Sequence, residues 1–251
     1  MVTTAISPAP GEQEPDAKIS PIGRVTGVLF SPTETYKDIV RKPNWIVPLL
    51  ILTAFSMMLC YFLVQKVDWA AFQRKQIESS SFTSNLTQEQ KDQAVERNVK
   101  FTVPITYAVG LLGPIISILI ITLVYWGSFN VFKGAGLKFG TAFAIVNYAY
   151  MPAVIGAVLT IIVVMLKRAG EVDPTRIAVT SLGNFLPGDA AKWLVALGSS
   201  IDLLWFWTLA LLAIGFAAAN PRKITTSSAF SVVIGMWIVF VLLKVGFAAM
   251  F

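Results

Sequence analysis

The chain alternates long apolar runs with shorter polar segments. Five of the apolar runs reach the roughly 20 residues that a helix needs to cross the hydrocarbon core of a bilayer. They lie at about residues 45–64, 101–126, 141–166, 200–219 and 230–251. The pattern predicts an all-α fold, a polytopic membrane protein whose five transmembrane helices form one bundle over residues 44–251.

A short amphipathic segment over residues 21–43 precedes the first run. In "FSPTETYKDIVRKPNW", Ser31 can cap a helix, Pro32 suits its first position and Glu34 can complete a capping box. One face of this helix is apolar and the other is cationic, with Tyr36, Ile39 and Val40 on the first and Lys37, Arg41 and Lys42 on the second. The pattern predicts a bent pair of helices at the membrane interface, with the cations near anionic headgroups. We favour an anchor in the interface over a docking face for a partner.

Two long polar loops separate the apolar runs. In residues 65–100, Thr87 is followed three positions later by Gln90, which predicts a capping box and a helix that continues into the second span. Residues 167–199 are too mixed in polarity to span, although 190–198 can form a helix lying flat at the interface. We expect both loops to be extracytoplasmic.

The distribution of charge predicts the orientation of the bundle. The two short loops, "GSFNVFKGAGLKFG" and "NPRKITTSS", each carry two cations and no acid. Because cations in short loops favour the cytoplasm, we expect a cytoplasmic N-terminus and an extracytoplasmic C-terminus in the inner (plasma) membrane of the cell. Residues 1–20, rich in Pro, Ser and acidic side chains, predict a disordered cytoplasmic tail.

The amino-acid composition restricts the kinds of chemistry that the chain can perform. Only 14% of the residues are charged, against about 25% in a soluble domain. The net charge of +6 comes mostly from cations beside apolar runs, which indicates contact with lipid and not with nucleic acid. Since the chain has no histidine and one cysteine, Cys60, imidazole-based catalysis and an intrachain disulfide are excluded. We therefore expect neither an enzyme nor a protein that holds a cofactor or metal.

Two ionisable side chains, Asp202 and Lys244, fall inside apolar runs, where such groups are functional candidates by default. Asp202 can instead sit in the first turn of a helix capped by Ser199 or Ser200, where a carboxylate favours the positive dipole end. The last two spans form a hairpin that brings Lys244 within a turn of Asp202. An ion pair between them is one interpretation, and snorkelling of Lys244 alone is the other.

Prolines punctuate the spans and predict kinks, at Pro48, Pro104, Pro114 and Pro152. A kink can open a cavity within a bundle, although in membrane helices it more often serves packing. A transport path would need polar groups near such a cavity, and Asp202, Asn147, Tyr148 and Tyr150 are the candidates.

Three stretches together resemble one family. They are "LFSPTETYKDIVRKPNWIVPLL", "FKGAGLKFGTAFAIVNYAYMPAVIGAVL" and "IDLLWFWTLALLAIGFAA". The first, with its Pro43-x-Trp45-x-x-Pro48 entry to a span, is similar to the opening of bacterial Yip-one domain proteins. The others resemble that family's Gly-rich turn with its Tyr-small-aromatic-Pro span, and its fourth span. The resemblance covers about residues 26–250.

The resemblance implies a five-helix membrane domain with a cytoplasmic N-terminus. Eukaryotic members associate with Rab-type GTPases and with each other, but the acidic, aromatic and Gly-Pro motif that precedes their first span is missing here, so GTPase binding is not carried over. We expect a non-enzymatic scaffold or membrane-organising factor whose partners are the bilayer, further copies of itself or another membrane protein. The alternatives are a small transporter or channel near spans two and three and Asp202, and an accessory subunit of a larger complex.

Overall fold

The computed structural model describes residues 18–188 and 190–250. These residues form helices, with one isolated β-bridge between Ser181 and Asp202. The helices are α1 (Pro21–Phe30), α2 (Pro32–Arg41), α3 (Ile46–Lys66), α4 (Trp69–Ser79), η1 (Ser81–Thr83), α5 (Gln88–Lys133), α6 (Phe139–Ala149), α7 (Met151–Leu166), η2 (Leu182–Phe185), α8 (Lys192–Gly198), α9 (Leu203–Ala219) and α10 (Thr226–Met250). The all-α prediction is confirmed for the described residues.

Four helical segments in the described part of the chain are long and apolar enough to cross a membrane: α3, α5, α6 with α7, and α10. The fourth predicted span, residues 200–219, contains α9, which is apolar but has 17 residues. That length stands at the lower limit for a spanning helix. The five-span count therefore stays a prediction.

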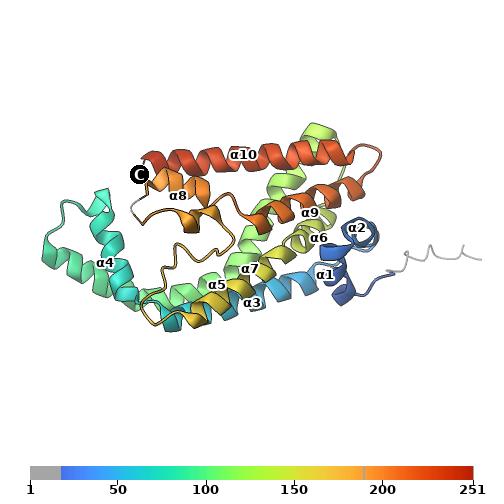
Figure 1. Ribbon diagram of the computed structural model, residues 1–251. Coiled ribbons are helices and arrows are strands. Elements are labelled where there is room, and N and C mark those ends of the chain that lie inside the picture. Colours follow the sequence, from blue (N-terminus) through green and yellow to red (C-terminus); the bar gives the residue numbers. More distant parts are fainter. Residues whose placement is uncertain (1–17, 189, 251) are drawn as a thin grey trace, which may run out of the picture.

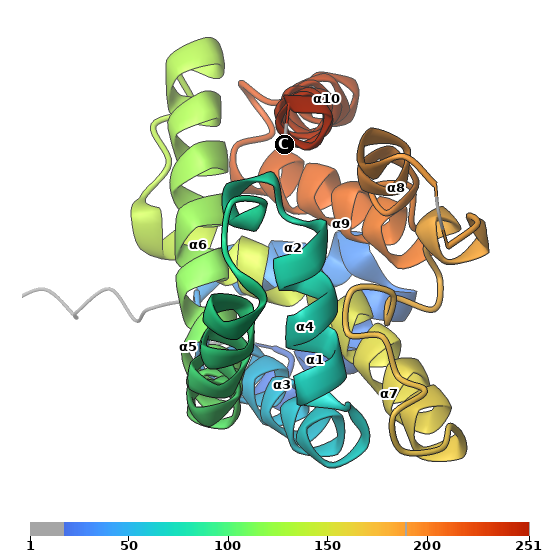
Figure 2. The same ribbon diagram turned by 90° about the vertical axis from the view of Figure 1, so that its left-hand side faces the viewer.

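The helices pack in two groups joined by α6 (Figure 1). In one group α3 packs against both α5 and α7, and in the other α9 packs against α10. Helix α6 contacts α5 on one side and α9 on the other, while the short helix α2 packs across α9 and α6. Figure 2, seen along the bundle, shows α5 and α10 at its periphery.

The connections at the two ends of the bundle are tied by hydrogen bonds. At the end near α1 and α2, Gly134 closes α5 in the left-handed conformation with φ of 55°, and the Asn220 side chain donates to the Ala135 carbonyl over 2.8 Å. At the opposite end, Lys66 Nζ donates to the carbonyls of Met165 and Lys167. The two short loops, one before α6 and one before α10, therefore lie at the end of the bundle where α1 lies. Helix α10 finishes at the opposite end (Figure 1).

Helix α5 has 46 residues, which is about 69 Å at the helical rise of 1.5 Å per residue and more than twice the hydrocarbon thickness of about 30 Å. Its start carries the predicted capping box, in which Thr87 Oγ1 accepts from the Gln90 N–H and the Gln90 side chain accepts from the Thr87 N–H. The polar first turns pack against α4. The prediction of a helix continuing from loop 65–100 into the second span is confirmed.

The four prolines have different local settings. Pro104 and Pro114 lie inside α5, which continues through both, so neither breaks the helix. Pro48 lies in the first turn of α3, where its missing N–H has no helical partner to lose, and the kink there stays a prediction. Pro152 is the second residue of α7, and the predicted span 141–166 is interrupted at Tyr150 into α6 and α7.

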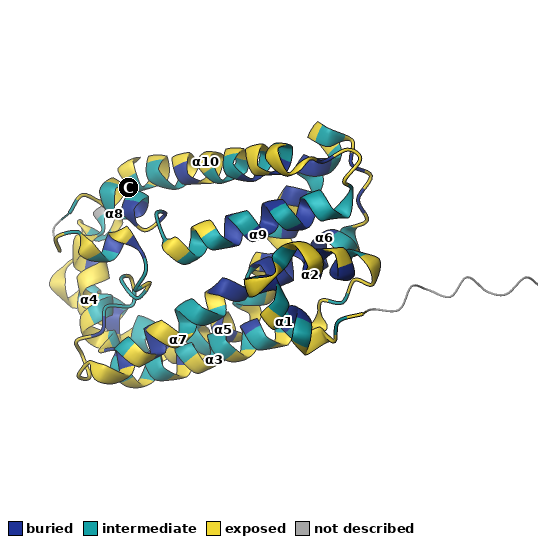
Figure 3. Cartoon of the chain, turned by 45° about the vertical axis from the view of Figure 1, so that its right-hand side comes forward, coloured by how far each residue is buried: buried dark blue, intermediate teal, exposed yellow. Residues whose placement is uncertain are grey.

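The core lies where α2, α6 and α9 meet (Figure 3). In α6, all eight residues from Ala142 to Ala149 are buried. The spanning helices are different, since only 11% to 33% of their most apolar stretches is buried. Apolar side chains that do not contact protein suit the hydrocarbon of a bilayer. Their outer faces therefore match a lipid environment.

Candidate functional site

A cavity of 420 Å³ lies between α7, α9 and α10, closed on one side by the chain leading into α9. Asp202 and Lys244, the two ionisable candidates that the sequence places in apolar runs, both line this cavity. Its walls are mostly apolar, and most of its polar members gather at the end where α9 begins: Thr180, Ser199, Ser200, Asp202 and Lys244.

The long connection between α7 and α9 folds back on itself to build this polar end. Its two arms are joined by the bridge between Ser181 and Asp202 and by the Leu182 N–H donating to the Ile201 carbonyl over 3.0 Å. Gly183 allows the arms to touch, since a Cβ there would lie 3.0 Å from the Ser199 backbone nitrogen. This close approach sets the Ser199 and Ser200 hydroxyls beside α10.

Asp202 is the N-cap of α9. Its Oδ1 accepts from the N–H groups of Leu204 at 2.8 Å and Trp205 at 3.1 Å, and its Oδ2 accepts from the Thr180 hydroxyl at 2.7 Å. A carboxylate at this position satisfies orphan N–H groups and favours the positive end of the helix dipole. Asp202 does lie at the start of a helix, as the capping interpretation predicted, but Asp202 itself is the N-cap residue. Ser199 and Ser200 lie about one turn before it and do not cap α9.

Lys244 binds the two serines. Its Nζ donates to Ser199 Oγ at 2.7 Å and to Ser200 Oγ at 3.1 Å. The ion pair with Asp202 is wrong, because these two described side chains face one cavity yet each has other partners. The carboxylate is held by the start of α9 and by Thr180, while the ammonium reaches the turn before it.

The apolar face of α2 points into the protein. Tyr36 and Ile39 are fully buried and Val40 is half-buried, and α9 and α6 cover them. Gly215 of α9 makes room, since a Cβ there would lie 2.8 Å from the Tyr36 ring and 2.5 Å from Ile145. The prediction that this face meets lipid or a partner is therefore wrong for Tyr36 and Ile39. The cations Lys37, Arg41 and Lys42 are exposed, as the helical spacing predicted.

The cap predicted for α2 is also partly wrong. Ser31 is its N-cap residue and Pro32 its first residue, but the Ser31 side chain makes no capping bond. Glu34 does not close a capping box and instead pairs with Lys37 over 2.8 Å, one turn along the exposed face. A Lys one turn away offers the Glu34 carboxylate a charged partner, whereas a capping box would offer it a backbone N–H.

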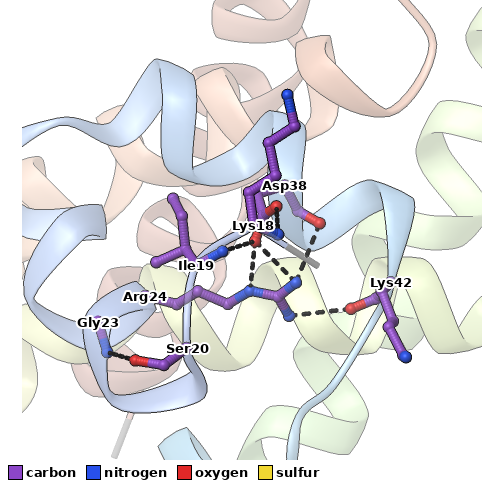
Figure 4. A network of polar contacts seen from close by, with 7 residues as sticks. All are labelled: Lys18, Ile19, Ser20, Gly23, Arg24, Asp38 and Lys42. Atoms are coloured by element: carbon purple, nitrogen blue, oxygen red, sulfur yellow. Dashed lines mark hydrogen bonds and ion pairs between the residues drawn. The ribbon is translucent and has the colours of Figure 1, made fainter. Parts of the chain in front are cut away.

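A buried ion pair fastens α1 to α2 (Figure 4). Arg24 and Asp38 contact over 2.9 Å, with side chains 2% and 5% exposed. The guanidinium also donates to the Asp38 and Lys42 carbonyls, and the Asp38 carboxylate accepts from the N–H groups of Lys18 and Ile19. Burial raises the pKa of the Asp38 carboxyl, but the Lys18 hydrogen bond and the adjacent Arg24 outweigh it, so the pKa lies below its ordinary value.

Sequence reasoning missed this network. The available signal was an arginine, Arg24, within the otherwise uncharged 10-residue α1, and an aspartate, Asp38, beside the apolar face of α2. The network also reaches back into the predicted disordered tail, because Lys18 and Ile19 are ordered by it. Residues 1–17 of that tail lie outside the described residues.

The polar residues expected along a transport path are dispersed. Asn147 and Tyr148 are fully buried in α6, where the Asn147 amide donates to the Phe143 carbonyl. Tyr150 and Pro114 line a separate cavity of 310 Å³ between α3, α5 and α7, whose walls are mostly apolar. Among the described residues, no group of three or more His, Cys, Asp or Glu side chains is placed to hold a metal ion.

Comparison with known protein families gives one assignment. The Yip1 domain model matches residues 26–247, which is most of the chain and includes α2, the core helix α6 and the cavity residues Asp202 and Lys244. No curated protein and no solved structure matches the chain. With its long apolar helices, the protein is a multi-pass integral membrane protein. The chain belongs to the Yip1 domain family.

Proposed function

We propose that this Yip1 domain protein is a non-enzymatic scaffold or membrane-organising factor that acts through helix packing and association with membrane proteins, including copies of itself. Under this proposal α9 also crosses the membrane, as the fourth of five transmembrane spans. The N-terminus and the two short, cationic loops lie in the cytoplasm, and the C-terminus lies outside the inner (plasma) membrane.

The observation that carries the proposal is the outer surface of α10. This helix packs on α8 and α9 and has few contacts with α5. Several large side chains in its second half are well exposed, among them Val239, Leu242, Leu243 and Phe247. A helix held along one side offers its other side to lipid or to a helix of another protein, where van der Waals packing supports association.

Cysteine crosslinking in native membranes tests association through this face. A Val239→Cys variant in a Cys60→Ala background places one thiol on the exposed face, and Val233→Cys on the buried side of the same helix is the matched control. We expect a discrete crosslinked species with Val239→Cys, and co-purification of that partner in mild detergent. A protein that purifies as a monomer, with both variants equally uncrosslinked, would contradict the proposal.

The 420 Å³ cavity supports the second candidate, a small transporter or channel. Its polar end combines a carboxylate and an ammonium group, as a substrate site within the membrane would. Asp202→Asn and Lys244→Ala separate the two candidates. If the protein is a transporter, both substitutions abolish the uptake of its substrate into proteoliposomes. If it is a scaffold, they lower the stability of the fold and leave the crosslink of Val239→Cys in place.

A further inference from the structure

We propose that the cavity between α7, α9 and α10 binds an anionic membrane lipid, with its phosphate head at Lys244 and its acyl chain along the apolar walls. The volume of 420 Å³ falls within the range of about 300–1,000 Å³ typical of small-molecule sites. This proposal is independent of the scaffold function, because a lipid can occupy the cavity whether or not α10 contacts a partner.

The first argument is the shape of the lining. On α10 the cavity extends from Lys244 to Trp237, and on α7 it extends from Thr160 to Ala153. Each stretch spans eight residues, and its seven steps of 1.5 Å give about 10 Å of helix. The cavity is therefore elongated along the helices, with its charged groups at the end where α10 finishes and its apolar walls deeper in the bundle. A lipid has the same division between head and chain.

The second argument is the chemistry of the deep walls. Gly156 and Ala157 leave space between the helices, and Trp237 and Phe240 supply aromatic surface. Two threonines also line the cavity, where the Thr160 hydroxyl donates to the Ile177 carbonyl and the Thr208 hydroxyl donates to the Leu204 carbonyl. These hydroxyl protons are engaged within the chain. The Trp237 indole N–H is buried without a hydrogen-bond partner in the described part of the chain, but the deep walls are otherwise mostly hydrocarbon and suit an acyl chain.

The third argument is the charge at the mouth. An ammonium group has three N–H donors, and the two partners that the structure gives Lys244 are the neutral hydroxyls of Ser199 and Ser200. The Asp202 carboxylate lines the same cavity, but its hydrogen bonds are with two backbone N–H groups and with Thr180, so the hydrogen bonds of Lys244 are to neutral groups. A cation surrounded by apolar helices is costly, and an anionic head supplies the missing charge. Basic pockets between membrane helices bind anionic headgroups for this reason.

Binding to the full-length protein in mild detergent tests the proposal with three probes. Lysophosphatidic acid carries the phosphate and one chain, the matching monoacylglycerol carries the chain alone, and inorganic phosphate carries the charge alone. Native mass spectrometry titrations give each dissociation constant. We expect lysophosphatidic acid to bind at least about tenfold more tightly than monoacylglycerol, as one charge-assisted hydrogen bond provides, and phosphate alone to bind far more weakly than either.

Paired variants locate the site. Lys244→Met should remove the preference for the phosphate head and Lys244→Arg should keep it, while Lys100→Met, at an exposed lysine on α5, should change nothing. Gly156→Leu fills the cavity against Leu204, whose side chain lies 3.1 Å from where a Cβ would sit, and should weaken both lipids. Gly235→Leu, which has open space around it on α10, is the control for size.

Any of the following results would overturn the proposal. Equal affinity for the two lipids, or a phosphate preference that persists in Lys244→Met, would remove the role of Lys244. Tight binding of inorganic phosphate alone would identify a site for a free anion and not for a lipid. If Lys244→Met does not purify as a folded protein, Lys244→Arg and Gly156→Leu decide instead. Loss of the phosphate preference in the first, or unchanged lipid binding in the second, rejects the site.

Discussion

Replacing Asp38 with alanine is expected to destabilise the folded protein by about 3–5 kcal/mol. That is the typical cost of removing one partner from a buried ion pair, because the other charge stays buried and unpaired. The setting of Asp38 meets this condition, since the Arg24 side chain is 2% exposed and its guanidinium contacts the carboxylate over 2.9 Å. Two N–H groups, of Lys18 and Ile19, also lose their acceptor.

The measurement is equilibrium unfolding in mild detergent, titrated with a denaturing detergent and followed by circular dichroism. The double variant Arg24→Met with Asp38→Leu separates a pair effect from a packing effect, because it removes both charges and keeps apolar volume. We expect it to recover most of the loss. The control is Glu34→Ala on the same helix, whose ion pair with Lys37 is 72% and 54% exposed and should contribute less than about 1 kcal/mol.

The reasoning would be refuted by either of two results. If Asp38→Ala cost no more than Glu34→Ala, the Arg24 charge would have to be solvated in the folded protein, in conflict with its burial. If the double variant lost as much free energy of unfolding as Arg24→Met and Asp38→Leu lose separately and added together, the two charges would act independently. This pair would then not hold α1 to α2.

Three further predictions follow from the same contacts. The pKa of Asp38 in the folded protein is below its ordinary value of 3.8. The stabilisation of the fold by the Asp38 carboxylate is therefore complete above pH 3.8 and is lost as the pH falls through the folded-state pKa. The free energy of unfolding of Asp38→Asn should accordingly depend less on pH in the acid range than that of the unsubstituted protein. Gly215→Leu should cost at least about 1–3 kcal/mol by overpacking, since even a Cβ would lie 2.5 Å from an α6 side chain, and Gly235→Leu should be neutral in the same assay. In a cysteine-free background, Lys223→Cys should react with a membrane-impermeant thiol reagent from the side of the N-terminus, and Arg168→Cys should react from the opposite side. The reason is that the connection before α10, with Lys223, and the connection after α7, with Arg168, lie at opposite ends of the bundle. Labelling of both cysteines from one side would contradict the topology.

Features that depend on a few neighbouring residues could be predicted from the sequence. The capping box at Thr87 and the position of Asp202 at a helix start both follow from interactions within one turn. The interruption near Tyr150 also has a local cause, because Pro152 has no N–H for a helical bond to the preceding turn. The sequence placed these features within a few residues.

Features that depend on distant segments could not be predicted in the same way. Periodicity shows that α2 has an apolar face, but it does not distinguish lipid from α6 and α9 as the surface that covers it, because both are apolar. The partners of Lys244 depend on the fold of the long connection before α9, which brings serines and not Asp202 to the ammonium group. Counting residues outward from a hairpin turn gives depth along a helix but not the direction of a side chain.

The buried cation of Arg24 and the half-buried cation of Lys244 differ in one respect that bears on function. The Arg24 guanidinium is paired with a carboxylate and two backbone carbonyls, so its charge and its donors are satisfied by the chain itself. Lys244 has two neutral hydroxyl partners and faces a cavity. A carboxylate, that of Asp202, lines the same cavity, yet its hydrogen bonds are with the start of α9 and with Thr180. Since an apolar environment penalises a charge without a counter-charge, the arrangement at Arg24 is complete by itself, whereas the arrangement at Lys244 becomes complete when an anion enters the cavity.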